Sequence, residues 1–222
     1  MRHYEHGTEP FRHWIIDDYF RPCLSWEIPG QNWRGWEVSY DNDVERGKRT
    51  SRDFYNMPSR IQEAFNHLRS QETVEAWRTI TEIPTLQDDP FAHGAGLHCS
   101  GDGAFLQIHL DYSLHPKITN KERRLNFILF LHPEWKPEWG GQLLLTDPVG
   151  KSKVEIDPLP GRLAVFETSA KSYHGMRQVI GAKWPRLSCA VYYLSDPVEL
   201  SGRQRALFFP NRSESGIPLE VA

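Results

Sequence analysis

The second half of the chain is a succession of short apolar segments separated by turn residues. Gly, Pro, Asn and Asp lie between them, and the segments are rich in Leu, aromatic or β-branched residues. Five or more strands at such close spacing predict an antiparallel sandwich or barrel. The segments are AFLQIHLDY, RLNFILFLH, GQLLLTD, KVEID, RLAVFET and RLSCAVYYLS.

Two helices are predicted before these strands. Pro58 suits a first helical turn, and apolar residues follow it at helical spacing: Ile61, Ala64, Phe65 and Leu68. Ser70 is the predicted N-cap of a second helix that carries Val74, Trp77 and Ile80. Residues 21–57, with many Trp, Gly, Asn and Asp, are expected to be irregular. The fold class is therefore mainly β, or α+β, with the helices packed outside the strands.

Length and charge bound the remaining possibilities. The 222 residues fit one large domain, and the 39% hydrophobic content is enough for a sizeable core. The net charge of −3 gives no electrostatic reason to expect a nucleic acid or a membrane as partner. Three widely spaced cysteines make neither a disulfide framework nor a zinc ribbon, and no apolar run approaches a membrane span. We expect a cytoplasmic protein.

A polar pair interrupts the apolar strand FLQIHLDY. Residues two apart in a strand point the same way, so His109 and Asp111 share one face. One imidazole and one carboxylate are two-thirds of the facial triad that binds non-haem Fe(II) and leaves coordination positions open. Taken alone, such a pair is usually a structural hydrogen bond. A third ligand must come from elsewhere, and among several histidines His174 is the best candidate, after the strand RLAVF and beside Gly175.

A second polar pair lies in the last strong strand. Arg186, twelve residues after His174, and Ser188 point to one face of RLSCAVYYLS. A guanidinium fork aimed into a barrel suits a carboxylate ligand, which it binds through two hydrogen bonds. A dicarboxylate with one end on the metal and the other on Arg186 accounts for both groups.

Together these segments resemble the Fe(II)- and 2-oxoglutarate-dependent dioxygenases, in particular their prolyl 4-hydroxylase-like branch. The resemblance covers about half of the chain, residues 96–195, and its most distinctive part is the W-x-P-E-W-G-G-x-L segment. It rests on GLHCSGDGAFLQIHLDYSLHP, ERRLNFILFLHPEWKPEWGGQLLLTD, LPGRLAVFETSAKSYHGMRQV and PRLSCAVYYLS.

The resemblance implies a double-stranded β-helix, or jelly roll, with N-terminal supporting helices. The chain is expected to be one dioxygenase domain, with helical support in about 1–95, a core in about 96–196 and an extension in 197–222. The implied cofactors are Fe(II), 2-oxoglutarate and O₂, with ascorbate keeping the iron reduced. His109, Asp111 and His174 are the implied catalytic iron ligands, and Arg186 with Ser188 the site of the distal carboxylate of 2-oxoglutarate.

One position departs from the family pattern. Related enzymes often carry a Tyr nine residues before the first metal-binding His, and here that position is Ser100. His98 is expected to take over its contact with 2-oxoglutarate. Asn126 is expected either to contact 2-oxoglutarate or substrate, or to bond backbone. Tyr112 and His115, which follow the metal pair, are the predicted substrate contacts.

The resemblance implies hydroxylation of an unactivated C–H bond with release of succinate and CO₂. The substrate is either a prolyl-type residue of a peptide or a small metabolite, and the residues do not separate these two classes. Desaturation, epimerisation and cyclisation use the same three ligands. The alternative function is a non-catalytic, cupin-like module that binds a sugar, a metal or a partner.

Overall fold

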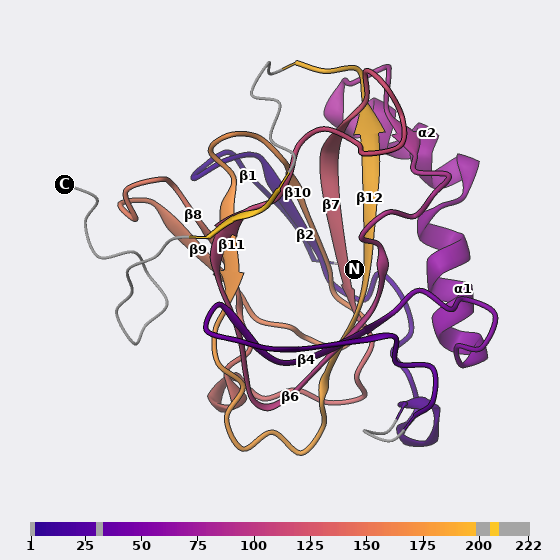
Figure 1. The fold of residues 1–222 in the computed structure, drawn as a ribbon, viewed down its shortest axis with the longest axis vertical. Coiled ribbons are helices and arrows are strands. Elements are labelled where there is room, and N and C mark those ends of the chain that lie inside the picture. Colours follow the sequence, from indigo (N-terminus) through magenta and orange to yellow (C-terminus); the bar gives the residue numbers. More distant parts are fainter. Residues whose placement is uncertain (1–2, 30–32, 199–204, 209–222) are drawn as a thin grey trace.

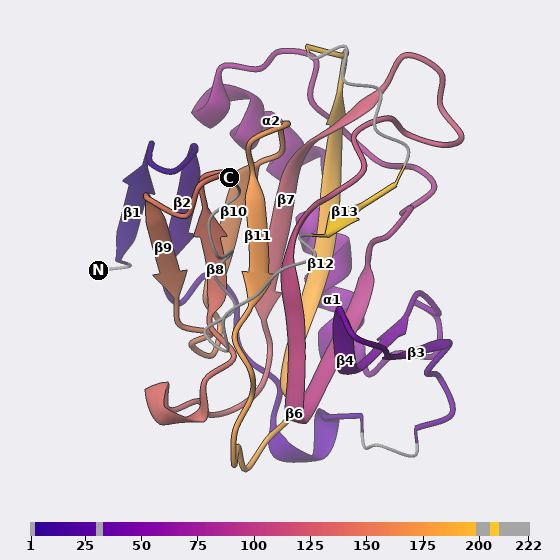
Figure 2. The same ribbon diagram turned by 60° about the vertical axis from the view of Figure 1, so that its left-hand side comes forward.

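The computed structural model describes residues 3–29, 33–198 and 205–208. In them an antiparallel sheet with the central order β1-β2-β10-β7-β12-β6-β11-β8-β9 curls on itself (Figures 1 and 2). The predicted mainly-β, jelly-roll type of fold is confirmed. The strands are β1 (Tyr4–Gly7), β2 (His13–Ile16), β3 (Val38–Asp41), β4 (Glu45–Ser51), β5 (Gln87–Asp88), β6 (Gly96–Leu110), β7 (Glu122–Phe130), β8 (Leu143–Thr146), β9 (Lys153–Ile156), β10 (Leu163–Glu167), β11 (Tyr173–Met176), β12 (Arg186–Ser195) and β13 (Leu207–Phe208).

Strand β6 links the two sides of the curled sheet. Its first limb, residues 96–100, pairs with β12, whereas its second limb pairs with β11 at Leu106 and His109. Between the limbs Gly103 has φ +77°, a backbone conformation that favours glycine. Because one strand serves both sides, residues near its two ends face a common interior.

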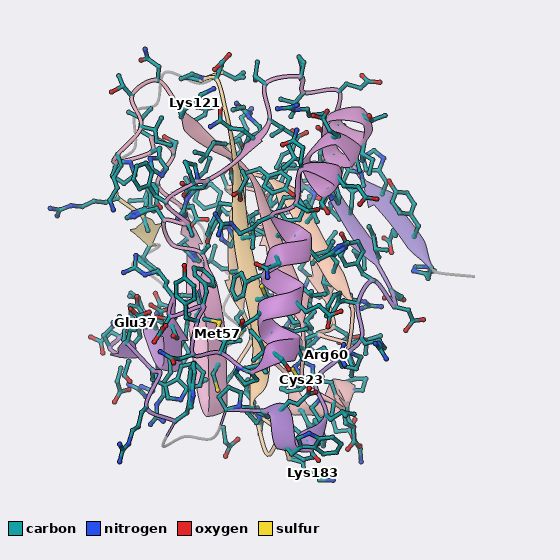
Figure 3. All side chains as sticks on the ribbon, turned by 90° about the vertical axis from the view of Figure 1, so that its right-hand side faces the viewer. Cys23, Glu37, Met57, Arg60, Lys121 and Lys183 are labelled. Atoms are coloured by element: carbon teal, nitrogen blue, oxygen red, sulfur yellow. The ribbon has the colours of Figure 1, made fainter. Side chains whose placement is uncertain are left out.

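Two helices cover the outer face of the sheet (Figure 3): α1 (Ser59–Leu68) and α2 (Gln71–Thr81). The predicted N-cap is confirmed, since the Ser70 hydroxyl accepts a hydrogen bond from Thr73 N at 3.2 Å. Trp77 packs edge-on against Trp14 and Phe127, with ring centroids 5.3 and 5.1 Å away. Ile80, expected beside Val74 and Trp77, is instead 39% exposed, because the apolar face of α2 turns away from it.

The segment expected to be irregular contains a hairpin. β3 pairs with β4, and β4 in turn runs along both limbs of β6 near the bend (Figure 1). The short 3-10 turns η1 (Ser25–Glu27) and η2 (Pro137–Trp139) complete the regular structure of the described residues. Residues before 95 therefore add strands as well as helices to the fold.

The division of the chain into one domain with support, core and extension stays a prediction. Of the expected C-terminal extension, residues 199–204 and 209–222 lie outside the described residues. In the described part of the chain no helix has the length and apolar character needed to span a membrane. The cytoplasmic location stays a prediction.

Candidate active site

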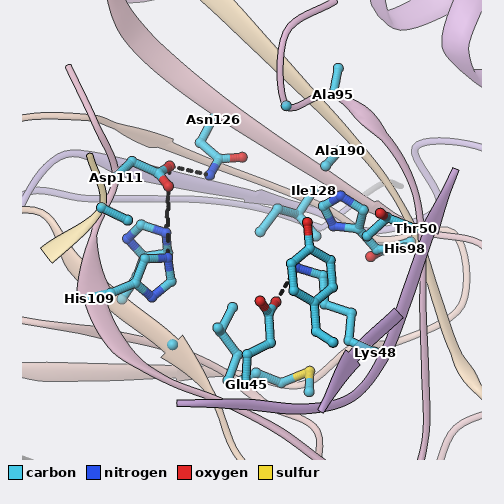
Figure 4. A pocket seen from close by; sticks show the side chains of 18 of the residues that line it. Glu45, Lys48, Thr50, Ala95, His98, His109, Asp111, Asn126, Ile128 and Ala190 are labelled. Atoms are coloured by element: carbon cyan, nitrogen blue, oxygen red, sulfur yellow. Dashed lines mark hydrogen bonds and ion pairs between the residues drawn. The ribbon is translucent and has the colours of Figure 1, made fainter. Parts of the chain in front are cut away.

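A cavity of about 420 Å³ opens between the two sides of the sheet. It is lined by most of the residues that the sequence singled out: His109, Asp111, His174, Arg186, Ser188, His98, Asn126 and Tyr112. These residues come from β6, β7, β11 and β12 and the loop after β6, so the curl of the sheet is what brings them together. Figure 4 shows Asp111 and His109 on one side of this cavity and His98 on the other.

The predicted metal ligands converge at one end of the cavity. His109 and His174 are directly paired residues on β6 and β11, and their ring centroids lie 4.3 Å apart. The Nε2 atoms of these two rings lie 3.7 and 3.8 Å from the carboxylate oxygens of Asp111. The three donor atoms all fall within 4.8 Å of one another, a spacing that one metal ion can bridge.

Backbone carbonyls orient both imidazoles. His109 Nδ1 lies 2.8 Å from Gln107 O, and His174 Nδ1 lies 2.9 Å from Ser172 O. A carbonyl can only accept, so each Nδ1 donates a proton to it, and Nε2 is the ring nitrogen that faces Asp111. Burial, and then the nearby His174, lower the pKa of His109 to about 3, which keeps that ring neutral. Neutral imidazoles with free Nε2 atoms are the form that binds a metal.

Asp111 stays ionised in this buried position. Burial alone would raise its pKa, but Arg123 and the two histidines outweigh that effect and lower it. The Asn126 amide also approaches the Asp111 carboxylate, with Nδ2 3.5 Å from Oδ2. Two imidazoles and one carboxylate therefore form a donor set that fits a divalent iron ion.

At the other end of the cavity lies a buried cation. Arg186 is 5% exposed, its Nε donates to Gly141 O at 2.7 Å, and its guanidinium lies over the ring of Phe130. Within the described residues no acidic side chain reaches it, and burial lowers its pKa to about 9. A buried guanidinium without a counter-charge is unfavourable. A carboxylate ligand would satisfy it, as the 2-oxoglutarate hypothesis requires.

The structure places His115 away from the cavity, unlike Tyr112. The Nε2 atom of His115 lies 3.2 Å from Asp89 Oδ2, and its Nδ1 atom accepts hydrogen bonds from Lys117 N and Ile118 N. Both ring nitrogens are thus used, and His115 is buried with Asp89 beneath the loop that follows β6. We assign His115 to the support of this loop rather than to substrate contact.

Several cavity residues were not predicted from the sequence. Arg123 lies between the rings of Tyr112 and Tyr192, at 3.6 and 3.5 Å from their centroids. Its Nη1 lies 3.5 Å from Asp111 Oδ2. From the N-terminal hairpin, β3 and β4 add further lining residues: Val38, Tyr40, Glu45, Lys48 and Thr50.

Comparison with known proteins agrees with this site. Residues 95–194 match the model of the 2OG-Fe(II) oxygenase superfamily. This part of the chain is therefore similar to the 2OG-Fe(II) oxygenases. No curated protein sequence matches the chain. The 2OG-Fe(II) oxygenase match begins just before β6 and ends within β12, so it contains both the predicted metal ligands and Arg186.

Solved structures of prolyl hydroxylases are similar to this chain. A prolyl-4-hydroxylase from Pseudomonas putida superposes with a TM-score of 0.51 at 19% identity, over 72% of this chain and 78% of that one. A prolyl hydroxylase from Trichoplax adhaerens, in complex with a hypoxia inducible factor oxygen degradation domain peptide fragment, gives a TM-score of 0.48 at 18% identity, over 81% and 71% of the two chains. The first of these structures supports the jelly-roll fold of the chain.

Proposed function

We propose that the chain is an Fe(II)- and 2-oxoglutarate-dependent dioxygenase that hydroxylates an unactivated C–H bond. One observation carries the proposal: the same cavity is lined by three metal-type donors and by a buried guanidinium that has no counter-charge among the described residues. A keto-diacid is the ligand class that satisfies both ends, through its keto-acid group on the metal and its distal carboxylate on Arg186.

Iron bound here would supply the oxidising chemistry, with one atom of O₂ entering the substrate hydroxyl and the other entering succinate as CO₂ leaves. The residues of the chain would bind the metal, the co-substrate and the substrate. His109, Asp111 and His174 would hold the metal, and Arg186 with Ser188 would fix the distal carboxylate. Tyr112 and Asn126, on the metal side of the cavity, would contact substrate or co-substrate, and His98 would contact 2-oxoglutarate.

The substrate is a prolyl-type residue of a peptide or a small metabolite. The hydroxylase complex from Trichoplax adhaerens contains a peptide, as its name states. The cavity of about 420 Å³ has room for 2-oxoglutarate and one further small group, which suits either class. An activity assay is therefore needed to distinguish a peptide substrate from a small metabolite.

The test is a succinate-release assay with Fe(II), 2-oxoglutarate and ascorbate over peptide and metabolite libraries. We expect slow uncoupled succinate formation without substrate and a marked rise with the true substrate. His174→Ala should abolish both. Wild-type protein that binds Fe(II) but neither binds nor turns over 2-oxoglutarate would contradict the proposal, and would favour a non-catalytic binding module.

A further inference from the structure

Four polar residues form a row across four adjacent strands. Tyr40 on β3 pairs with Lys48 on β4, Lys48 pairs with Ser100 on β6, and Ser100 pairs with Arg186 on β12. All four line the cavity. Directly paired residues on neighbouring strands project to the same face, so Lys48 and Arg186 flank Ser100 inside the cavity.

Ser100 stands where related dioxygenases often have a Tyr that contacts 2-oxoglutarate. The serine is 2% exposed and far shorter than a tyrosine, and it lines the cavity between Lys48 and Arg186. His98 offers no positive charge to a carboxylate at this position. Burial and the nearby Lys48 lower the pKa of His98 and keep its ring neutral. It belongs to the next row, paired with Thr50 and Ser188.

Lys48 offers a positive charge beside Ser100. Its side chain is 15% exposed and its Nζ lies 2.5 Å from Glu45 Oε1. An ammonium group has three N–H donors, and this contact uses one. Figure 4 shows Lys48 beside Thr50 and His98, on the opposite side of the cavity from Asp111. Lys48 lines the same cavity as His98 and Asp111.

We infer that Lys48 is a second anchor for the distal carboxylate of 2-oxoglutarate, reaching it across Ser100 while Arg186 binds it from the other side. This inference rests on the proposed function. It assigns a co-substrate contact to the N-terminal hairpin, which lies outside the matched residues 95–194. Glu45 holds the ammonium in place and balances its charge when the cavity holds no carboxylate.

The test measures binding rather than turnover. Protein loaded with Mn(II) is titrated with 2-oxoglutarate and with 2-oxopentanoate, which has a methyl group in place of the distal carboxylate. Calorimetry gives both Kd values. Lys48→Met should raise the Kd for 2-oxoglutarate about 10- to 100-fold, the effect of one charge-assisted hydrogen bond, and leave the Kd for 2-oxopentanoate unchanged. Lys48→Arg should restore part of the loss.

Two further variants control for a general loss of positive charge and for misfolding. Arg46→Met removes a cation from the same strand at an exposed position and should change neither Kd. Glu45→Gln combined with Lys48→Met avoids an unpaired buried carboxylate, and should show the same selective loss if Lys48→Met alone folds poorly. Equal weakening of both ligands, or an unchanged Kd for 2-oxoglutarate, would overturn the role of Lys48. Wild-type protein that binds no 2-oxoglutarate would instead overturn the proposed function.

Discussion

Arg123 lies 3.5 Å from the carboxylate of Asp111, and both side chains are almost fully enclosed. The guanidinium is held between two tyrosine rings, so it cannot turn away when the carboxylate is removed. Its remaining contacts go to His93 O and the Tyr112 hydroxyl. Asp111 balances a buried cation that cannot move away, and under the proposed function it would also offer an oxygen to the metal.

The first prediction follows from these two roles. Asp111→Ala should lose the increase in melting temperature that wild-type protein shows on addition of Fe(II) or Mn(II), and should release no succinate. The metal-free variant should also be less stable by about 1–3 kcal/mol, because Arg123 is left without its counter-charge. Thermal and urea unfolding, with and without metal, measure both effects. Asp43→Ala, at an exposed turn, is the matched control and should change neither.

A second prediction concerns the start of α2. The Ser70 hydroxyl accepts a hydrogen bond from Thr73 N, which otherwise has no partner inside the helix. Ser70→Ala should therefore lower the free energy of unfolding by about 1 kcal/mol in urea titrations. Thr79→Ala removes a hydroxyl from an exposed position of the same helix and should have little effect. Equal effects of the two variants would contradict the capping role.

The sequence predicted the metal end of the cavity because two simple periodicities meet there. His109 and Asp111 share a face by strand alternation, and His174 follows a strongly apolar strand. The structure places these three residues together. The helices were predictable for a similar reason, since the apolar spacing and the N-cap residue agree.

The hairpin β3–β4 could not be predicted in this way. Strand β4 reads ERGKRTS, with no apolar alternation, and at its centre Gly47 has φ +65°. It forms because it pairs with both limbs of β6, a non-local interaction that local pattern does not encode. The hairpin contributes Glu45 and Lys48 to the cavity, and the sequence analysis missed both residues for that reason.

Arg123 was missed because of a bulge. Counting alternate residues back from Asn126 along β7 places Arg124, not Arg123, toward the cavity. In the structure Tyr193 and Leu194 pair with Leu125 and Arg123, so Arg124 is an extra residue on β7. A bulge of this kind reverses which side chains face inward, and its position depends on the partner strand.

A third prediction concerns thiol reactivity and its pH dependence. All three cysteines are free and buried, and burial raises the pKa of Cys23 and Cys99 to about 12. Only the thiolate reacts, so at pH 8 about one thiol in 10,000 is in reactive form. Native protein should be inert to a disulfide reagent at pH 8 and react faster as the pH rises. After unfolding in guanidinium chloride, three thiols should react quickly.

The opposite result would be a thiol of the native protein that reacts completely within seconds at pH 8. It would mean that one cysteine is accessible and has a lowered pKa. Reaction that follows the rate of global unfolding, measured independently by tryptophan fluorescence, would instead support burial as the cause.

The last prediction separates a supporting role of His115 from a substrate contact. His115→Ala removes the hydrogen bond to Asp89 and the acceptor for Lys117 N and Ile118 N. Each group left unpaired in a buried place destabilises the fold, so the free energy of unfolding should fall by about 1–3 kcal/mol. The backbone amides of Lys117 and Ile118 should exchange faster with deuterium, because the ring no longer accepts their hydrogen bonds.

Binding of 2-oxoglutarate to the metal-loaded variant should remain close to wild type at a temperature where His115→Ala is folded, since the ring does not line the cavity. His3→Ala, at an exposed histidine, is the control for the loss of an imidazole. A variant with wild-type stability and wild-type exchange, but with a selective rise in KM for substrate, would show that the ring reaches the substrate after all. The joint measurement decides the role because stability and KM respond to different contacts: the hydrogen bonds to Asp89 and the loop affect the first, and direct contact affects the second.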